Sequence, residues 1–397
     1  MRVLVLNSGS SSLKAELFDT DRGGAIARVL VERIGLPDAR ISLDAAGVRK
    51  ERALRVATHD EAGGGAIDAL LREGAPPVLR SLDEIDGVGH RVVHGGERFH
   101  ASVRIDDAVL EAIEACVPLA PLHNPANLAG IRAMQRLLPG KLQVAVFDTA
   151  FFQTMPPVAF HYGVPRAWYE RHGVRRYGFH GTSHRYVAAR AAEALGIARP
   201  DLVTLHLGNG CSMACIQGGI AIDATMGLTP LEGLVMGTRS GDVDPALVFH
   251  LVHAGVPLDE IHETLERGSG LLGLSGVSSD LRDVERAAAS GNARAALALD
   301  VFAHRARKYV GAFLAELGSC HALVFTAGIG ENSASMRARI LAGLAPLGLV
   351  LDPERNAADS RGPRRIDDGR GRAQVWVIPT DEELQIARDV VALAGDA

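Results

Sequence analysis

The chain has no apolar run that approaches the ~18 residues needed to span a bilayer, so we expect no membrane-spanning segment. Its 42 basic and 47 acidic residues leave a net charge of −5, which gives no general attraction to nucleic acid or to an anionic membrane. The opening MRVLVLNSGS is a short apolar run that stops at Asn7, typical of a first strand and not of a signal peptide. We therefore expect neither nucleic acid nor a membrane as a partner.

Cysteine is scarce and scattered. The four cysteines, at positions 116, 211, 215 and 320, fit a reducing compartment, so we expect a cytoplasmic protein. Cys211 and Cys215 lie four residues apart, but no second Cys/His pair stands at metal spacing, which favours a structural role over a zinc site. The sequence also lacks the G-x-x-x-x-G-K-[ST] motif and a complete G-x-G-x-x-G after the first strand. A P-loop protein is thereby excluded and a dinucleotide-binding fold is disfavoured.

Glycine, by contrast, is abundant. It occupies 44 of 397 positions, which is about 11 % against a usual share of about 7 %. Because no collagen period accompanies it, this excess predicts many tight turns and close approaches of the backbone. The length alone predicts two to three domains, since domains commonly have about 100–200 residues.

Two similar hairpins, one in each half of the chain, suggest an internal duplication. The first joins strands over 2–6 and 13–18, and the second joins strands over 202–207 and 211–216. Further strands are predicted at 87–93, 142–147, 322–326 and 374–378, and helices at 107–116, 127–138, 183–195, 292–317 and 381–393, the last capped by Thr380. This mixture favours a layered α/β architecture. The stretches 45–75 and 361–372 are interpreted as peripheral, the second as an exposed loop.

Three glycine-rich turns could present backbone N–H groups to an anion, over 7–12, 208–210 and 328–332. Any one of them is more commonly just a turn. Lys14 follows the first turn and could reach a phosphate as a point charge. Three such turns in one chain, with that lysine, favour phosphate binding.

Four polar segments interrupt apolar surroundings. Arg91 lies within a predicted strand, Asp148 ends another, His180 stands between glycines, and Arg239 follows Gly237. Alone, each arginine would be interpreted as half of a surface ion pair and His180 as a structural histidine. The fourfold repetition beside glycine favours a site that needs close approach, where the arginine fork suits carboxylate and phosphoryl oxygens.

Taken together, these segments resemble the acetokinase family of acetate kinases, with a match from residue 3 to 387. The matching stretches are VLVLNSGSSSLK (3–14), GHRVVHGGE (89–97), FDTAF (147–151), GFHGTSHRYV (178–187), LHLGNG (205–210), TPLEGLVMGTRSGDVDP (229–245), SSDLRDVE (278–285), GIGEN (328–332) and EEL (382–384). The resemblance implies a duplicated ribonuclease-H-like α/β fold of the sugar kinase, Hsp70 and actin group, with two domains around a central cleft. It implies an N-terminal domain over 1–150, completed by a C-terminal helix over 383–397, and a nucleotide-binding domain over 151–382. It also implies a homodimer.

The resemblance further implies the residues of the site. Asn7 and Glu382 match metal-associated positions, with Mg²⁺ as the metal and Mn²⁺ as an alternative, and Lys14 matches a contact to the nucleotide phosphates. The positions that match ATP-binding segments are His206, Leu207, Gly208, Asn209, Gly210, Asp280, Leu281, Arg282, Gly328, Ile329, Gly330, Glu331 and Asn332. Those that match the apolar pocket around the substrate methyl are Val93, Leu122, Phe179 and Pro230.

The catalytic positions implied by the resemblance are Arg91 and Arg239, which grip acetate and the phosphoryl group, with Asp148 and His180 as the active-site aspartate and transition-state stabiliser. Two departures stand out: Phe152 occupies a position where many relatives have histidine, and Asp381 one where many have asparagine. Asp381 would add negative charge beside the expected metal, so it could tune metal affinity.

The implied reaction is ATP + acetate ⇌ ADP + acetyl phosphate. Acetate resembles a glutamate side chain, whose pKa is about 4.3, so it is an anion at neutral pH and needs no general base. Asp148 is then an orienter of arginine or of metal-bound water, and direct in-line transfer needs no covalent phosphoenzyme. A propionate or other short-chain carboxylate kinase is one alternative, because one methylene changes binding by only about 1–3 kcal/mol. The other is a non-catalytic nucleotide-binding module like the ATPase half of Hsp70, which we would expect to carry a partner-binding region.

Overall fold

The computed structural model describes residues 1–73, 77–360 and 362–395. Contacts divide the chain into two compact units, Met1–Gln153 with Asp381–Ala397 (unit 1) and Thr154–Thr380 (unit 2). The domain boundaries expected at 150/151 and 382/383 stay predictions, because compactness does not show that a unit folds separately. The ends of three predicted stretches, at residues 75, 361 and 396–397, lie outside the described residues.

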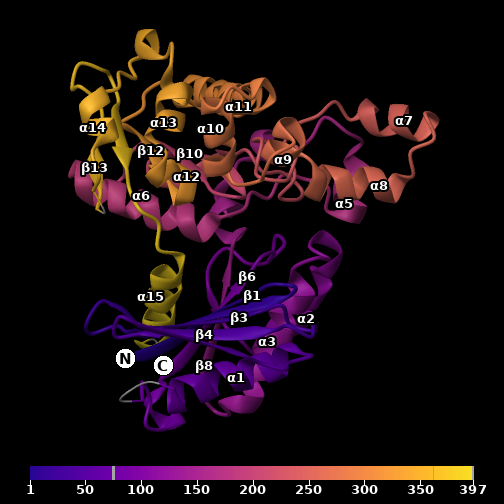
Figure 1. Ribbon diagram of the computed structural model, residues 1–397, viewed down its shortest axis with the longest axis vertical. Helices are drawn as coiled ribbons and strands as arrows, with labels where there is room; N and C mark the ends of the chain where they lie inside the picture. The colour runs from indigo at the N-terminus through magenta and orange to yellow at the C-terminus, as the bar shows by residue number, and fades with distance from the viewer. Residues whose placement is uncertain (74–76, 361, 396–397) are drawn as a thin grey trace. The chain divides into compact units, whose positions relative to one another are not determined.

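Unit 1 is built on an eight-stranded sheet with the order β5-β4-β3-β2-β1-β6-β8-β7 (Figure 1). Its strands are β1 (Arg2–Ser8), β2 (Ser12–Asp19), β3 (Gly24–Glu32), β4 (Arg40–Ala45), β5 (Val48–Ala53), β6 (Gly87–Val92), β7 (Val103–Arg104) and β8 (Leu142–Phe147). Its helices are α1 (His59–Arg72), α2 (Asp107–Ala115), α3 (Asn124–Leu137) and α15 (Glu382–Gly395).

Unit 2 is built on a six-stranded sheet with the order β11-β10-β9-β12-β14-β13. Its strands are β9 (Leu202–Leu207), β10 (Cys211–Gln217), β11 (Ile220–Ala224), β12 (Ala322–Thr326), β13 (Arg364–Arg365) and β14 (Gln374–Val377). Its helices are α4 (Pro157–Phe160), α5 (Arg166–His172), α6 (Gly181–Leu195), α7 (Ala246–His253), α8 (Leu258–Glu263), α9 (Gly270–Ser275), α10 (Leu281–Ala289), α11 (Ala293–Leu317), α12 (Ala327–Asn332), α13 (Ala334–Leu341) and α14 (Pro353–Ala357).

The two sheets share one core topology. In unit 1, β1 pairs antiparallel with β2, β2 with β3, and β1 continues parallel into β6 and β8. In unit 2, β9 pairs antiparallel with β10, β10 with β11, and β9 continues parallel into β12 and β14. Three antiparallel strands followed by two parallel ones therefore occur twice, as the paired hairpins of the sequence indicated.

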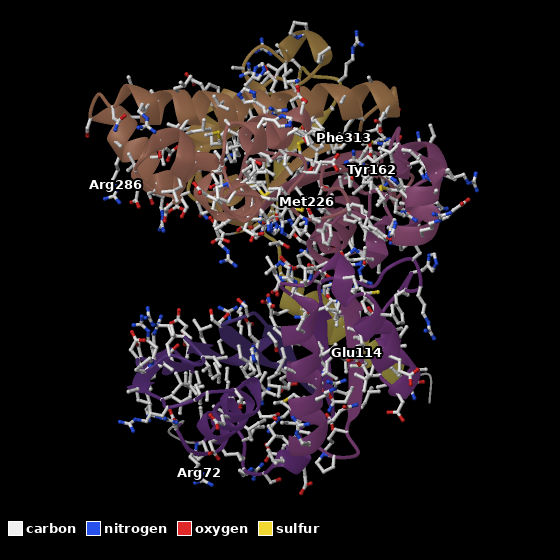
Figure 2. All side chains as sticks on the ribbon, turned by 90° about the vertical axis from the view of Figure 1, so that its right-hand side faces the viewer. Arg72, Glu114, Tyr162, Met226, Arg286 and Phe313 are labelled. Atoms are coloured by element: carbon white, nitrogen blue, oxygen red, sulfur yellow. The ribbon has the colours of Figure 1, made fainter. Side chains whose placement is uncertain are left out.

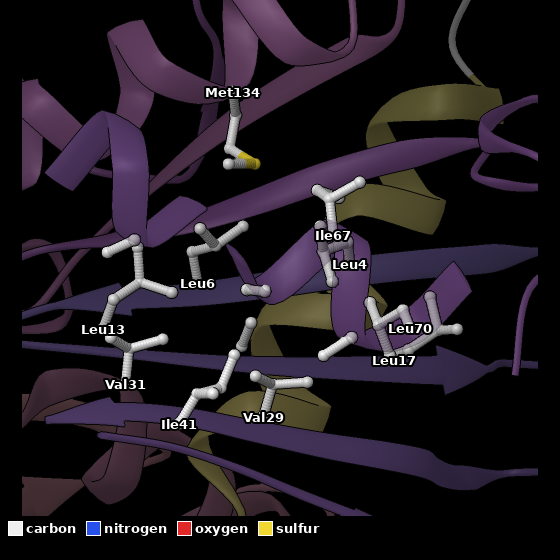
Figure 3. Close-up of a cluster of buried hydrophobic side chains, with 14 of the residues drawn as sticks. Leu4, Leu6, Leu13, Leu17, Val29, Val31, Ile41, Ile67, Leu70 and Met134 are labelled. Atoms are coloured by element: carbon white, nitrogen blue, oxygen red, sulfur yellow. The ribbon is translucent and has the colours of Figure 1, made fainter. Parts of the chain in front are cut away.

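Both faces of the unit 1 sheet are covered. Side chains alternate along β1, so its apolar residues pack on both faces. Leu4 and Leu6 face a core formed with α1 and α3, seen in Figure 3 with Ile67 and Met134. The odd-numbered apolar residues of β1 pack instead in a cluster with α15, which lies against β1, β6 and β8 (Figure 1). That contact is close: a Cβ on Gly89 would approach Ile386 Cγ2 to 2.5 Å. The C-terminal helix thus belongs to the core of unit 1.

The core of unit 2 lies around its sheet and the long α11. Figure 2 labels Phe313 of α11 and Met226 within this unit, both buried, whereas Arg286 of α10 projects outward. Among the described residues, no helix has the length and apolar character that crossing a membrane requires.

Two expectations about peripheral stretches are corrected. The stretch 45–75 is not wholly peripheral, because α1 buries Ala62, Ile67 and Leu70 in the core, although β5 is exposed. The stretch 361–372 is not simply a loop, because it contains β13 and the buried Asp367.

Thr380 does not cap the final helix, and the third glycine turn is helical. Asp381 Oδ1 accepts from Leu384 N at 2.9 Å, which is the hydrogen bond of an N-cap. Residues 328–332 lie within α12, after the strand that ends at Thr326.

Candidate active site

Three predicted site residues meet where strands of unit 1 end. Asn7 lies near the end of β1, Arg91 near the end of β6, and Asp148 directly after β8. Because these strands are parallel, their carboxyl ends lie at one edge of the sheet, which is where open α/β sheets bind ligands. Arg91 donates from Nε to Asp148 Oδ1 (3.0 Å), from Nη2 to Asp148 Oδ2 (2.6 Å) and from Nη1 to Asn7 Oδ1 (3.3 Å). The sequence placed them on separate segments, and the structure brings them into hydrogen-bond contact.

The Arg91–Asp148 pair is rigidly held. The Asp148 side chain is 1 % exposed and that of Arg91 is 21 % exposed. Burial alone would lower the pKa of Arg91, but the charges of Asp148 and Glu382 outweigh it and raise that pKa above its usual value. Asp148 therefore compensates the charge of Arg91 and fixes the orientation of its fork.

Lys14 lies in the same unit and contacts two carboxylates that the sequence did not single out. Its Nζ lies 2.8 Å from Glu16 Oε1 and 2.5 Å from Glu383 Oε1. Burial would lower the pKa of Lys14, but these carboxylates raise it. Glu383 was signalled by the EEL motif, whereas Glu16 follows the ordinary alternation of its strand, and it is the packing of α15 on the sheet that brings Glu383 to Lys14.

Negative charge is in excess in this cluster. Five carboxyl groups face three cations, which are Lys14, Arg28 and Arg91; the carboxyl groups are those of Glu16, Asp148, Asp381, Glu382 and Glu383. Burial raises the pKa of Glu382 to about 7, Arg91 opposes that rise, and Asp148 adds to it. A divalent cation would relieve this excess.

The residues present fit such a cation by charge and by donor type. Among residues 1–73, 77–360 and 362–395, no three His, Cys, Asp or Glu side chains form a ready-made metal cage. Mg²⁺ is commonly held by one or two carboxylates together with substrate phosphates and water, so a cage of protein groups is not required. Asn7 and Glu382 can each supply an oxygen ligand, while Asp381 is engaged as the cap of α15.

In unit 2, three distant segments enclose a cavity of about 600 Å³. Its lining residues are Gly208, Asn209, Ser279, Asp280, Leu281, Arg282, Glu285, Gly328, Ile329, Asn332 and Ser333. The volume is within the ~300–1,000 Å³ typical of small-molecule sites. The expected ATP segments therefore converge on one cavity, to which α10, α12 and the turn after β9 contribute.

Some residues expected to bind ATP do not line this cavity, and some residues that line it were not expected from the sequence. His206, Leu207, Gly210, Gly330 and Glu331 are absent from its lining. Glu331 is used structurally, since its Oε1 accepts from the backbone N–H of residues 327 (2.8 Å) and 380 (3.1 Å). The missed lining residues are Ser279, Glu285 and Ser333, the last two joined by a 2.8 Å hydrogen bond. The first two lie within the SSDLRDVE motif, which was the available signal.

His180 occupies a strained position in front of α6. It is a non-glycine residue with φ of 57°, at the N-cap of the helix. Its ring stacks on that of His206, with centroids 4.2 Å apart. Its Nδ1 lies 2.9 Å from Ser212 Oγ. The left-handed backbone costs on the order of 1–3 kcal/mol and is commonly found at functional sites.

Arg239 lies beside His180, in the space left by a glycine. A Cβ on Gly210 would lie 3.3 Å from His180 Nε2 and 3.6 Å from Arg239 Nη1. That Nη1 donates to Pro230 O at 3.1 Å, and Nε lies 3.7 Å from Glu266 Oε2. The sequence theme of glycine beside arginine and histidine therefore corresponds to a real convergence in unit 2.

The expected methyl pocket stays a prediction. Val93 and Leu122 lie in unit 1, where Leu122 is 45 % exposed, and Phe179 and Pro230 lie in unit 2.

Phe152, which replaces a common histidine, is fully buried and packs edge-on against its neighbour in the chain with centroids 5.4 Å apart. It occupies a packing position.

Comparison with known proteins agrees with this geometry. The model of the acetokinase family matches residues 2–388. The acetate kinase of Geobacillus kaustophilus (strain HTA426) is 51 % identical and the match covers 99 % of both chains. The crystal structure of Porphyromonas gingivalis acetate kinase has a TM-score of 0.95 at 46 % identity over 99 % of both chains. A propionate kinase from Francisella tularensis subsp. tularensis SCHU S4 has a TM-score of 0.92 at 41 % identity over 98 % of both.

These similarities extend over nearly the whole chain. Together with the repeated sheet topology, they confirm the duplicated ribonuclease-H-like, actin-like fold that the resemblance implied. A sequence identity of 51 % over 99 % of both chains shows common descent and not only a shared fold. The chain belongs to the acetokinase family.

Proposed function

We propose that this chain catalyses the reversible transfer of a phosphoryl group from ATP to acetate, giving ADP and acetyl phosphate. The observation that carries the proposal is the cluster in which Asp148 holds the Arg91 fork next to Asn7, in a chain of this family. A fork fixed by one carboxylate is suited to meeting another planar anion with parallel hydrogen bonds. Acetate is such an anion at neutral pH.

Arg91 and Arg239 are proposed to bind acetate and the moving phosphoryl group. The main barrier to this reaction is bringing an anion toward a polyanion, and phosphoryl transfer is catalysed chiefly by positioning and by electrostatic stabilisation. Asp148 acts as a positioning residue for Arg91, because both of its oxygens are already engaged by that guanidinium. It is therefore not assigned a proton-accepting role.

His180 is proposed to donate from Nε2 to a phosphoryl oxygen. This nitrogen and Arg239 Nη1 point toward the same space beside Gly210. The cavity of unit 2 is proposed to hold ATP, with the phosphates toward Gly208–Asn209 and Gly328, and Lys14 as a further phosphate contact.

Asn7 and Glu382 are proposed to hold the divalent cation, with Mg²⁺ as the physiological ion and Mn²⁺ as a substitute. When bound, this ion offsets phosphate charge and orients the nucleotide. The chain's own residues favour binding of this ion, because the half-buried Glu382 lies among an excess of carboxyl groups.

Propionate is the alternative acceptor, favoured by the similarity to the Francisella propionate kinase. An apolar pocket distinguishes one methylene only weakly, by about 1–3 kcal/mol. Comparing kcat/KM for acetate and propionate at saturating Mg-ATP decides which acceptor is preferred.

A homodimer is proposed through the apolar surface of α7 and α8. Phe249 of α7 is 66 % exposed and Leu258 of α8 is 61 % exposed, and the two helices contact each other. Exposed apolar side chains gathered on one surface mark interaction sites. Light scattering of the wild type and of Phe249→Asp tests this. A monomeric mass for the wild type contradicts the proposal.

The free cysteines favour a cytoplasmic location.

The activity is tested by trapping acetyl phosphate as its hydroxamate from ATP, Mg²⁺ and acetate. We expect product only when acetate is present, and a loss of about 10²–10³-fold in kcat for Arg239→Ala, by analogy with oxyanion-binding donors. A chain that binds ATP but shows no acetate-dependent turnover would instead be a nucleotide-binding module.

A further inference from the structure

A chain of hydrogen bonds runs from β9 through α6 and β10 to the ring of His180. Thr204 Oγ1 lies 2.7 Å from His184 Nδ1, and His184 Nε2 lies 2.8 Å from Ser212 Oγ. Ser212 Oγ in turn lies 2.9 Å from His180 Nδ1. Thr204, His184 and Ser212 are each no more than 1 % exposed, so bulk solvent does not reach their polar atoms.

The register of the sheet explains why these residues meet. Ser212 pairs with His206 and Ala214 with Thr204 across β10 and β9, so the side chains of Thr204 and Ser212 lie on one face. Helix α6 covers that face and contributes His184 one turn after His180. The series of hydrogen bonds from Thr204 to His180 is therefore built into the secondary structure of unit 2.

The protons of this chain can be placed completely in one direction. Each neutral imidazole has one N–H, and each hydroxyl has one proton to donate. If Thr204 donates to His184 Nδ1, then His184 Nε2–H donates to Ser212, and Ser212 donates to His180 Nδ1. The remaining proton of a neutral His180 is then on Nε2, on the side that faces Gly210 and Arg239.

The opposite direction leaves a buried proton without an acceptor. With His180 Nδ1–H donating to Ser212, and Ser212 to His184, the N–H of His184 would donate to Thr204. Within the described part of the chain, Thr204 Oγ1 has no other recorded partner, so its own proton would be orphaned in a fully buried site. An unmade buried hydrogen bond is destabilising. His184 is neutral, as both arrangements require, because burial and the nearby His206 hold its pKa well below the usual value.

We propose that Thr204, His184 and Ser212 form a directional relay that fixes His180 as the Nε2–H tautomer, so that it is ready to donate a hydrogen bond. In a histidine, the partner of one ring nitrogen sets the protonation of the other. The three are positioning residues, because they act through His180. Their effect on catalysis rests on the proposed function, whereas the tautomer itself does not.

The tautomer is measured on the free full-length protein, without substrate. Long-range ¹H–¹⁵N correlation spectra of ¹⁵N-histidine-labelled protein distinguish the two ring nitrogens, and His180→Gln identifies the signals of His180. We expect a predominantly Nε2–H ring in the wild type at neutral pH. A predominantly Nδ1–H ring or a doubly protonated ring in the wild type overturns the proposal.

Thr204→Val and Thr204→Ser provide the decisive pair, since valine keeps the shape and serine keeps the hydroxyl. In Thr204→Val we expect both tautomers of His180 and a decrease in kcat of about 10–100-fold, the usual effect of losing an outer-shell partner, with little change in KM. Thr204→Ser should restore both quantities. Thr182→Val is the matched control, because Thr182 Oγ1 is also buried on α6 and has no recorded partner among the described residues.

The outcomes separate this relay from a purely structural role and from the proposed function. If Thr204→Val lowers kcat while His180 keeps its Nε2–H tautomer, the relay is refuted. If Thr204→Val changes neither the His180 tautomer nor kcat, the relay is also refuted. If the tautomer responds as expected but no acetate-dependent turnover is found in the wild type, the relay is supported and the proposed function fails.

Discussion

Replacing Arg91 separates its contribution to stability from its contribution to catalysis. Arg91→Ala leaves Asp148, which is 1 % exposed, without the guanidinium that contacts both of its oxygens. Breaking a buried pair by removing one partner costs about 3–5 kcal/mol. Because the Arg91 side chain is itself 21 % exposed, we expect the lower end, about 3 kcal/mol. For a cooperative transition of 150–250 residues each kcal/mol lowers Tm by about 2–4 °C, so the transition in which unit 1 unfolds should move about 6–12 °C lower.

The double variant Arg91→Ala/Asp148→Asn should recover most of that stability. Asparagine keeps the shape of the side chain but removes the uncompensated charge. Activity should not return, because no guanidinium remains to offset the charges of the reactants, and kcat should stay about 10²–10³-fold below the wild type. Calorimetric unfolding gives Tm, and the hydroxamate assay gives kcat for the same preparations.

A matched control is Arg80→Ala in the same unit. Arg80 is 89 % exposed and pairs with Glu84 at 3.1 Å, and such surface pairs contribute only about 0–1 kcal/mol. It should change neither Tm nor kcat appreciably. If the double variant regains kcat together with Tm, then Arg91 is only a counter-ion for Asp148 and our assignment is wrong. Near-normal turnover of Arg91→Ala alone would contradict the assignment as well.

Three further predictions concern the metal, the pH dependence and a glycine. Glu382→Ala should raise the Mg²⁺ concentration needed for half-maximal rate, and an unchanged titration would make Glu382 structural. Glu316 is exposed overall, but the partial desolvation of its carboxyl and then the nearby Asp223 raise its pKa to about 7; the native state thus holds an extra proton, and stability should fall as pH rises from about 4.5 to about 7. Glu316→Gln should remove that slope in Tm against pH, and the exposed Glu260→Gln should not. Gly210→Ala should fold normally but lose turnover, because its Cβ would lie 3.3 Å from the His180 ring; equal kcat values would refute this.

The strands were predictable because their apolar patterns are local, but helix α1 was not. Both hairpins match the structure closely, since alternation and a small polar turn determine them within a few residues. Helix α1 contains Gly63, Gly64 and Gly65, which lower its intrinsic helix propensity. The structure shows what the glycine allows: a Cβ on Gly63 would approach Met134 Cε to 2.7 Å, so glycine lets α1 pack closely on α3 without moving that side chain. Tertiary packing overrides propensity at this position.

The site was predictable where motifs end strands and less so where packing joins elements. Arg91 and Asp148 could be selected as polar residues at strand ends, although their contact depends on the parallel pairing of β6 with β8. Glu16 resembles an ordinary outward-facing residue of a hairpin until α15 covers it. Ser212 has no signal of its own, because its hydrogen bonds depend on the register between β9 and β10.

The carboxylates of unit 1 have two opposed effects on anion binding. They hold Arg91 and Lys14 in fixed positions, which reduces the entropy lost when a substrate binds. They also cancel the positive charge that would attract an anion, and leave the cluster negative overall. A divalent ion resolves this conflict, since it restores positive charge without loosening the side chains. The metal requirement of the proposed reaction therefore follows from how the protein orders its own cations, as well as from the charge of ATP.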